Sequence, residues 1–424
     1  MVDPRELLLA SFRAAIAVAD PLEIVPSHLP PPPRGRTVVV GAGKAGGAMA
    51  LAVERHWPGN APLEGIVITR YGHSLPTRRI RVIEAGHPVP DEKGEGAARE
   101  ILAAASSLAE EDLLLVLVSG GGSALLSLPA EAIPMEDLKA VTKSLLASGA
   151  TIQEMNTVRK HLSAIQGGRL AAATRARVLA LVISDVTGDD PTHIASGPCA
   201  PDPTTFADAA EILRRNRVTP PASIDARLEA GMTGRVPETP KPGDPAFARV
   251  ENRVIATAQA SLAAAGETFR ARGVTPLILG DSVTGESREV AKVFAAFARQ
   301  IRQHAQPLRP PVALVSGGET TVTIRGRGRG GRCAEFLLSL AIELGGLERT
   351  HAIACDTDGI DGSEDNAGAL LGPDSLARAV AAGLDARRLL ADNDGYGFFS
   401  ALGDLVVTGP TRTNVNDYRA ILLA

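Results

Sequence analysis

A lysine stands inside a glycine-rich turn near the start of the chain, Gly41-Ala42-Gly43-Lys44-Ala45-Gly46. The turn follows the apolar run 37–40 and opens a predicted helix over 44–56. In this strand–turn–helix context, backbone N–H groups and the positive end of the helix dipole can bind phosphate. A cation at the helix start suits a transferring phosphoryl group, so we predict that Lys44 is catalytic. The glycines of the turn are predicted to bind phosphate or an acceptor carboxylate: Gly41, Gly43 and Gly46.

A nicotinamide dinucleotide is the alternative ligand, because the same turn fits the G-x-G-x-x-G pattern. A dinucleotide site also needs an acidic residue at the end of the next strand, where it holds the ribose. Here that strand ends Ile68-Thr69-Arg70, without an acid. Arg70 would suit a 2′-phosphate, so an NADP-dependent reductase stays open at this point. A tight turn without any ligand stays open as well.

Two more glycine-rich loops follow predicted strands, one at 119–123 and one at 316–319. Consecutive glycines allow several N–H groups to converge on one anion, and serine hydroxyls add donors. A flexible loop without a ligand is the alternative for each. We predict anion binding by these residues: Ser119, Gly120, Gly121, Gly122, Ser123, Ser316, Gly317 and Gly318.

An arginine-rich stretch ends at Arg332, where a helix is predicted to begin. Arg325 and Arg327 could equally belong to a solvated basic loop. Arg332 is predicted to be catalytic, because a guanidinium group at this position could stabilise charge on a transferring phosphoryl group. Asn156 and Arg159 lie three residues apart on another predicted helix and could contact the acceptor. A solvated helix face is the alternative for this pair.

Carboxylates cluster after two buried strands, in the stretches 184–191 and 356–362. Open α/β sheets place their ligand chemistry at the carboxyl ends of strands. Mg²⁺ usually takes one or two carboxylates together with phosphate oxygens and waters. Asp189 is our preferred general base or metal ligand. The other candidate Mg²⁺ ligands are Asp185, Glu319 and Asp358, and stabilisation of tight turns is the alternative role for both clusters.

The elements that must position these loops alternate along the chain. Continuous apolar strands separated by helices are typical of a parallel sheet covered on both faces. The proline-rich stretch 237–245 interrupts the pattern, which then resumes. We therefore predict a two-domain α/β protein: a Rossmann-like domain over 1–236, a linker over 237–250 and a second α/β domain over 251–424. In the second domain we expect strands at 277–279, 312–315, 321–324, 351–355 and 404–408.

Composition excludes several classes of protein. The 44 basic and 48 acidic residues give a net charge of −4, which argues against a nucleic-acid-binding face. Three scattered cysteines form neither a disulfide framework nor a CxxC metal site. No stretch reaches the roughly 18 apolar residues that a membrane helix needs, and the N-terminus lacks a signal-peptide pattern. We expect a cytoplasmic protein with small-molecule partners, neither nucleic acid nor membrane, and a homodimer as the candidate assembly.

Taken together, the motifs resemble the class II glycerate kinases, or glycerate 2-kinases, with a C-terminal MOFRL domain. The stretches that carry the resemblance include VVVGAGKAGGAMA, AGHPVPDEKG, VSGGGSALL, MNTVRKHLSAIQGGRLA, VISDVTGDDPTHIASGPCAPDPTT, VSGGETTVTIRGRGRGGR, DTDGIDGSEDNAGAL and TGPTRTNVNDY. The resemblance implies an active site in the cleft between two domains, with the MOFRL region at about 310–420. It also implies phosphorylation of D-glycerate, usually at the 2-hydroxyl, by ATP with Mg²⁺. The family's active-site lysine and arginine fall on Lys44 and Arg332, and Asn414 lies in a motif expected at the site.

The sequence departs from the family pattern at five positions inside these motifs. Where the family usually has Lys, Asn-Gln, Gly and Gly, this chain has Gln166, Cys333-Ala334, Asp356 and Arg412. These changes favour the hypothesis that the acceptor is another small hydroxy acid or polyol, and drift with unchanged function is the alternative. Two other classes stay open: an NAD(P)-dependent hydroxypyruvate reductase, and a non-catalytic sugar-acid-binding homologue.

Overall fold

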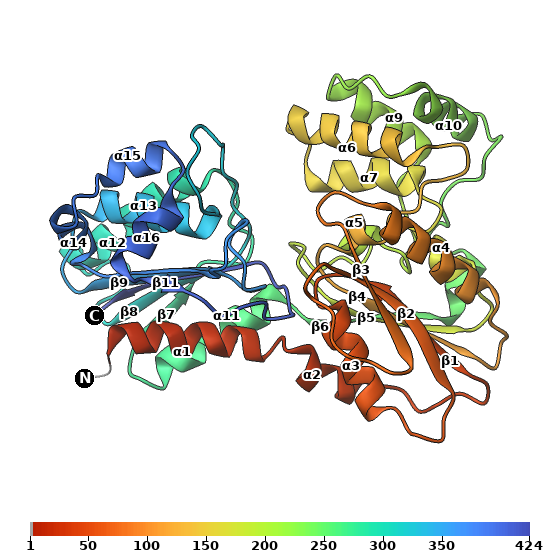
Figure 1. Cartoon of the computed structure of the whole chain (residues 1–424), viewed down its shortest axis with the longest axis horizontal. Helices are drawn as coiled ribbons and strands as arrows, with labels where there is room; N and C mark the ends of the chain where they lie inside the picture. The colour runs from red at the N-terminus through yellow and green to blue at the C-terminus, as the bar shows by residue number, and fades with distance from the viewer. Residues whose placement is uncertain (1–2) are drawn as a thin grey trace. The chain divides into compact units, whose positions relative to one another are not determined.

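The computed structural model describes residues 3–424, and the chain divides into two compact units (Figure 1). The N-terminal unit is Pro21–Ile255, and the C-terminal unit combines the chain up to Asp20 with Ala256–Ala424. The predicted boundaries were therefore wrong at two places. Residues 237–250 are not a linker, because they and the strand that follows belong to the N-terminal unit. The first helix, α1 (Pro4–Ala17), belongs to the C-terminal unit because its apolar side chains join that unit's core.

The N-terminal unit contains a six-stranded sheet with the order β3-β2-β1-β4-β5-β6. Its strands are β1 (Thr37–Ala42), β2 (Leu63–Arg70), β3 (Ile80–Ala85), β4 (Leu113–Val118), β5 (Arg177–Ile183) and β6 (Val250–Ala256). The first five pair in parallel. Strands β1 and β4 are buried along their whole length, as their continuous apolar sequences predict. The chain runs outward from β1 to β3 and then crosses to β4 on the other side of β1, so the topological switch point lies between β1 and β4.

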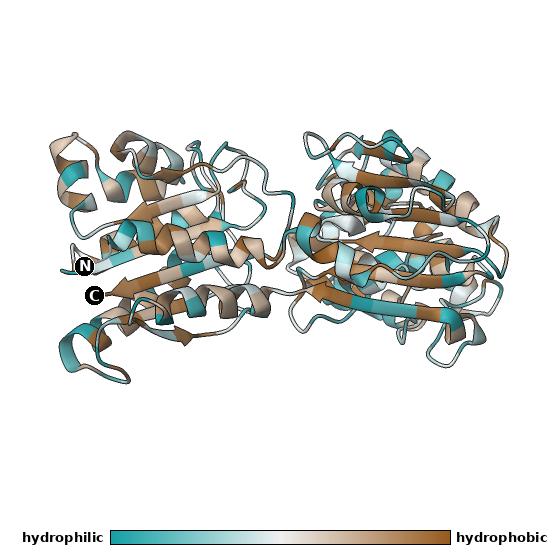
Figure 2. Ribbon diagram, turned by 90° about the horizontal axis from the view of Figure 1, so that it is seen from below, coloured by the Kyte–Doolittle hydropathy of each residue, from teal (hydrophilic) through white to brown (hydrophobic). Residues whose placement is uncertain are grey.

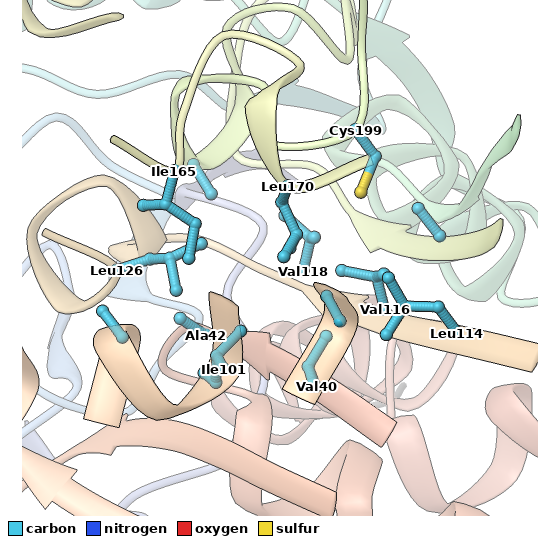
Figure 3. Packing of buried hydrophobic residues seen from close by; sticks show 14 of the residues in the cluster. Val40, Ala42, Ile101, Leu114, Val116, Val118, Leu126, Ile165, Leu170 and Cys199 are labelled. Carbon is cyan, nitrogen blue, oxygen red and sulfur yellow. The ribbon is translucent and has the colours of Figure 1, made fainter. Parts of the chain in front are cut away.

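Helices cover both faces of this sheet. Ile101 of α4 (Glu92–Ser106) packs with Val40 and Val116 on one face (Figure 3). On the other face, α3 (Gly46–His56) begins against Val67 of β2. The shorter elements of this unit are α2 (Pro21–Ile24), η1 (Val25–His28), α5 (Gly122–Leu125), α8 (Arg169–Ala172), η2 (Ile194–Ser196) and η3 (Pro245–Arg249).

Four more helices form a separate layer of the N-terminal unit with an apolar core of its own, visible as a group in Figure 1. They are α6 (Met135–Ser148), α7 (Ile152–Leu162), α9 (Phe206–Arg215) and α10 (Ala222–Met232). The helix α7 begins with a capping box, in which the Thr151 side chain and the Glu154 side chain bond each other's backbone N–H groups. It carries Asn156 and Arg159, two of the predicted site residues.

The C-terminal unit contains a mixed sheet with the order β11-β10-β9-β12-β8-β7. Strand β12 pairs antiparallel with both β8 and β9, while β7 and β8 pair in parallel. The strands are β7 (Thr275–Ile278), β8 (Val312–Ser316), β9 (Thr350–Asp356), β10 (Gly368–Leu371), β11 (Leu405–Val406) and β12 (Asp417–Leu423). Figure 2 shows that most strands of both sheets carry apolar stretches, drawn in brown, alongside some polar residues in teal. The helices are α1, α11 (Ala258–Arg270), α12 (Ser287–His304), α13 (Arg332–Leu344), α14 (Ser375–Ala381), α15 (Ala386–Ala391) and α16 (Gly395–Leu402).

The two-domain α/β fold is confirmed, but two strands of the second sheet were predicted wrongly. Residues 321–324 form only one isolated bridge, between Thr321 and Glu286, and the strand expected at 404–408 shrinks to the two residues of β11. The central strand β12 was missed because it begins with charged residues. Asp417 and Arg419 are nonetheless buried, since they form an ion pair with each other. Within residues 3–424, no helix is long and apolar enough to cross a membrane.

Candidate active site

The glycine-rich loops that follow β1 and β4 touch each other at the switch point of the N-terminal sheet. A Cβ atom on Gly41 would lie 1.9 Å from the Leu117 carbonyl oxygen, and one on Gly43 would lie 2.0 Å from the Ser119 hydroxyl. Only glycine permits this approach, and both glycines have positive φ angles. The Lys44 N–H donates to the Gly120 carbonyl at 2.8 Å and locks the two loops together. In open α/β sheets, ligands bind at such a switch point, beyond the carboxyl ends of the strands.

The backbone of the first turn is already used inside the protein, which changes the interpretation of its glycines. The N–H groups of residues 43–46 donate, in order, to Ile68 O, Gly120 O, Ser119 Oγ and Gly43 O. A turn with these donors occupied cannot cradle a phosphate through them, so the glycines serve close packing. What the turn offers to a ligand is the side chain of Lys44.

The second loop has the free donors that the first lacks. The N–H groups of Gly120, Gly121 and Ser123 donate to no acceptor within the described chain. Gly121 has a φ of +79° and precedes the short helix α5. Gly122 is covered by Ala195, whose Cβ would lie 2.5 Å from a Cβ at that position. We refer to residues 119–123 as the anion cradle of this unit, and their role in binding an anion stays a prediction.

Two basic side chains flank the cradle at Gly121. A Cβ at this glycine would lie 2.9 Å from Nε2 of His87 and 3.4 Å from Cγ of Lys44. His87 follows β3, and its loop is fixed by Asp91, whose carboxylate accepts the N–H groups of Gly86 and Gly94 at 2.9 Å each. His87 was not among the predicted site residues. Its place just after a parallel strand and its position inside the motif AGHPVPDEKG are the signals that could have indicated it.

A strained turn connects the cradle to α7. Ala195, Ser196 and Gly197 are all left-handed, with φ angles of 49°, 56° and 59°. Such a conformation costs a non-glycine residue on the order of 1–2 kcal/mol and is concentrated at functional sites. Ser196 Oγ lies 2.9 Å from Ser123 Oγ and 3.2 Å from Asn156 Oδ1. Sequence reasoning missed Ser196 because its hydroxyl reaches Ser123 only when residues 195–197 adopt this left-handed turn.

Three departures from the family pattern lie in the interior of the protein. Gln166 is buried, and its amide donates to the carbonyls of Ser123 at 2.9 Å and Leu126 at 3.2 Å. Cys333 and Ala334 are fully buried in the core of the C-terminal unit. Arg412 has a φ of +62°, which explains why a glycine is usual at this position.

The acidic candidates of the N-terminal unit follow β5, which neighbours β4. Asp185 and Asp189 are both partly buried, and Asp189 has a φ of +53°. Its N–H donates to the Val186 carbonyl at 3.0 Å in a tight turn. Within residues 3–424, no group of three or more His, Cys, Asp or Glu side chains forms a metal-binding cluster. Asp185 and Asp189 stay the predicted Mg²⁺ ligands of this unit, since Mg²⁺ takes most of its ligands from phosphate and water.

The candidates of the C-terminal unit surround Arg332 at the start of α13. The guanidinium group lies 2.7 Å from Asp417, 2.7 Å from Asp356 and 3.2 Å from Glu319. Burial opposes its charge, but these three carboxylates together raise the pKa of Arg332 well above its usual value. Asp356, one of the departures, therefore has a defined role as a partner of Arg332. In this arrangement Arg332 organises an acidic cluster, and its predicted contact with a phosphoryl group stays a prediction.

The remaining candidates of this unit lie around the same strand ends. Gly318 has a φ of +93° and packs against the Val283 backbone, while the Gly317 carbonyl accepts a hydrogen bond from Arg419 at 2.9 Å. Ser316 and Asn414 are buried. The Asp358 carboxylate accepts the Ile360 N–H at 2.9 Å. These residues stabilise loops of the C-terminal unit, and their role in binding stays a prediction.

Known proteins resemble this chain over its whole length. Residues 7–229 match a family described as a domain of unknown function (DUF4147), and residues 312–417 match the MOFRL family. A protein of Agrobacterium vitis, provisionally named a hydroxypyruvate reductase, is 53% identical over 100% of this chain and 95% of its own length. The D-glycerate 2-kinase of Thermotoga maritima is 38% identical over 98% of both chains.

A solved structure of glycerate kinase from Thermotoga maritima has the same fold. It superimposes with a TM-score of 0.87 at 37% identity and covers 99% of both chains. The family and its enzyme class, phosphotransferases with an alcohol group as acceptor, agree with the prediction made from the motifs. The chain belongs to the glycerate kinase family with DUF4147 and MOFRL domains.

Proposed function

We propose that this protein is a glycerate 2-kinase, which transfers the γ-phosphoryl group of ATP to the 2-hydroxyl of D-glycerate. The observation that carries the proposal is the cradle at the switch point, where unused N–H groups of residues 119–123 meet Lys44. Phosphoryl transfer needs little covalent chemistry from the protein, because positioning and charge stabilisation do most of the work. Backbone N–H donors and one lysine, at the carboxyl ends of the central strands, supply positioning and charge stabilisation.

The reaction balances with residues that the chain provides. The 2-hydroxyl oxygen of the acceptor attacks the γ-phosphorus, the bond to the ADP oxygen breaks, and the hydroxyl proton passes to Asp189 as general base. Lys44 and the N–H groups offset the charge on the transferring oxygens. Mg²⁺, when bound, would neutralise charge on the phosphates, and Asp185 is the residue of this unit that would hold it while Asp189 acts as the base. The proposed role of Arg332 is to hold the acidic cluster of the C-terminal unit, Glu319, Asp356 and Asp417, in place.

The positions of the departures support D-glycerate itself as the acceptor. Gln166, Cys333 and Ala334 are buried in packing positions, where they contact protein atoms. A change of acceptor pocket would instead require substitutions at side chains that reach the ligand. We therefore favour drift with unchanged function over a new substrate.

The reductase alternative has one observation in its favour, the provisional name of the Agrobacterium vitis relative. The first turn argues against it. Its N–H groups are occupied, and Thr69 at the end of β2 donates its hydroxyl to the Gly43 carbonyl at 3.0 Å, where a dinucleotide enzyme would place a ribose-binding acid. The provisional name of this relative is therefore not enough to favour an NADP-dependent reductase.

The test is ADP release from ATP and Mg²⁺ over a panel of D-glycerate, L-glycerate and other small hydroxy acids and polyols. A parallel assay follows NADPH absorbance with hydroxypyruvate. Turnover with D-glycerate and no NADPH oxidation is the expected result. NADPH oxidation without ADP release would establish the reductase instead, and inactivity in every assay would favour a non-catalytic binding protein.

A further inference from the structure

Arg159 on α7 carries a charge that the protein itself does not balance. Its only hydrogen bond in residues 3–424 runs from Nη1 to Asn156 Oδ1, at 3.4 Å, and no acidic side chain there forms an ion pair with it. The side chain is nevertheless partly buried. Arg332 has three carboxylate partners, so the contrast between the two arginines is clear.

This environment favours an anionic ligand. Burial lowers the pKa of Arg159, and no neighbouring acid raises it again. The end of α7 offers only the partial negative charge of its last carbonyl groups. Withdrawing a cation from water is costly unless a partner compensates it. A guanidinium group has five N–H donors, and nearly all of those on Arg159 are unused.

The neighbours of Arg159 fix its position relative to the anion cradle. Asn156 Oδ1 accepts from both Arg159 and Ser196, while Asn156 Nδ2 donates to the His193 carbonyl at 3.2 Å. Ser196 in turn contacts the hydroxyl of Ser123, the last residue of the cradle. The amide of Asn156 is thus occupied by protein groups and orients the arginine. A short, continuous chain of side chains links the guanidinium group to residues 119–123.

We propose that Arg159 binds the carboxylate of the acceptor, while the cradle and Lys44 take the phosphoryl group. The planar fork of arginine matches a carboxylate with two parallel hydrogen bonds, whereas several converging N–H groups and a lysine suit a phosphate. In D-glycerate the carboxylate is attached to the carbon that bears the 2-hydroxyl, so the group that Arg159 would bind and the hydroxyl that accepts the phosphoryl group lie on neighbouring carbons of one small acid. This inference rests on the proposed function for the identity of the acid.

The experiment compares the full-length wild type with Arg159→Met and Arg159→Lys. Arg214→Ala is the control, because Arg214 lies on α9 of the same unit and its side chain is exposed. Calorimetry measures the Kd of D-glycerate, of its neutral analogue D-glyceramide, and of ATP, and turnover is measured alongside. Circular dichroism melting checks that each variant is folded. If Arg159→Met does not fold, Arg159→Lys, which keeps the charge and loses the fork, carries the comparison.

Arg159→Met should weaken D-glycerate binding roughly 10- to 100-fold, the value of hydrogen bonds to a charged group. Its Kd for D-glyceramide and for ATP should stay at the wild-type value, and Arg159→Lys should fall between the two proteins. Equal losses for acid and amide, a loss for ATP alone, or no carboxylate binding by the wild type would overturn the assignment. If the wild type binds D-glycerate through Arg159 but shows no turnover, the proposed function fails and this inference stands. If the wild type turns over D-glycerate and Arg159→Met binds D-glycerate with an unchanged Kd, the proposed function stands and this inference is overturned.

Discussion

The buried ion pair between Lys160 and Asp202 offers a quantitative test of how the site is held. Lys160 Nζ lies 2.7 Å from Asp202 Oδ1, and the two side chains are 1% and 0% exposed. Thr204 donates to the same carboxylate oxygen through its hydroxyl, at 2.6 Å, and through its N–H, at 3.0 Å. The Asp202 N–H donates to the Pro240 carbonyl at 2.9 Å. The pair thus ties α7, which carries Arg159, to the segment that follows the strained turn.

Asp202→Asn keeps the shape of the side chain and removes its charge. The ammonium group of Lys160 is then left buried without a counter-ion. Breaking a buried pair in this way typically costs about 3–5 kcal/mol, which corresponds to a roughly 100- to 5,000-fold larger unfolding constant. Lys160→Met removes the other charge and should cost a similar amount. In the double variant neither charge is stranded, so its cost should fall at least about 2 kcal/mol below the sum of the two.

Urea denaturation of the full chain, followed by circular dichroism, measures these costs through the transition of the N-terminal unit. The pH dependence adds an independent check. Burial raises the pKa of Asp202, but Lys160 and Thr204 outweigh it and hold that pKa below its usual value. The contribution of the carboxylate is therefore present above the unfolded pKa of about 3.9 and is lost as the pH falls below it. A cost below about 1 kcal/mol for Asp202→Asn, or additive costs in the double variant, would refute this reasoning.

Three further predictions concern the cradle, the start of α13 and Lys44, the proposed catalytic residue. Gly122→Ala would press a methyl group against Ala195, 2.5 Å away, so it should cost about 1–3 kcal/mol in urea denaturation and lower turnover; unchanged activity and stability would contradict this packing. Burial raises the pKa of Asp361, which accepts the N–H of Cys333, to about 6. Because the folded pKa lies above the unfolded value, the free energy of unfolding should fall by about 3 kcal/mol as the pH rises from about 4 to 6. Urea denaturation of Asp361→Asn should lack this pH-dependent component. Parallel pH profiles of the wild type and the variant would contradict this assignment. Lys44→Met should lower kcat roughly 10²- to 10³-fold with an unchanged melting temperature, and near-normal kcat would remove Lys44 from the mechanism.

Much of the fold could be predicted from the sequence because local patterns determine it. The apolar runs of β1, β4 and β5 are continuous, and glycine-rich turns end two of them, so a parallel sheet with helices on both faces follows. The strand β12 could not be predicted from its own residues. Its charged start becomes buried only because Asp417 finds Arg332 and Arg419 as partners in the folded unit.

The candidate site, too, could be predicted from the sequence only in part. Lys44 and the loop 119–123 were indicated by residue type and spacing, and the structure brings them together at one glycine. The roles of Ser196 and His87 depend on turns and on neighbouring strands, which single-sequence spacing does not reveal. Gln166 was interpreted as a lost cation in the acceptor pocket, whereas its amide donates to the carbonyl groups of Ser123 in the cradle and of Leu126 just after it.

The most direct test of the proposed activity follows the phosphoryl group itself. ³¹P NMR of the wild type with ATP, Mg²⁺ and D-glycerate reports where the γ-phosphoryl group goes, and Lys44→Met serves as the comparison. We expect the signal of 2-phosphoglycerate to grow as that of the ATP γ-phosphorus declines, and to stay at background in the variant. Inorganic phosphate as the only product, or equal formation of 2-phosphoglycerate by both proteins, would contradict the account.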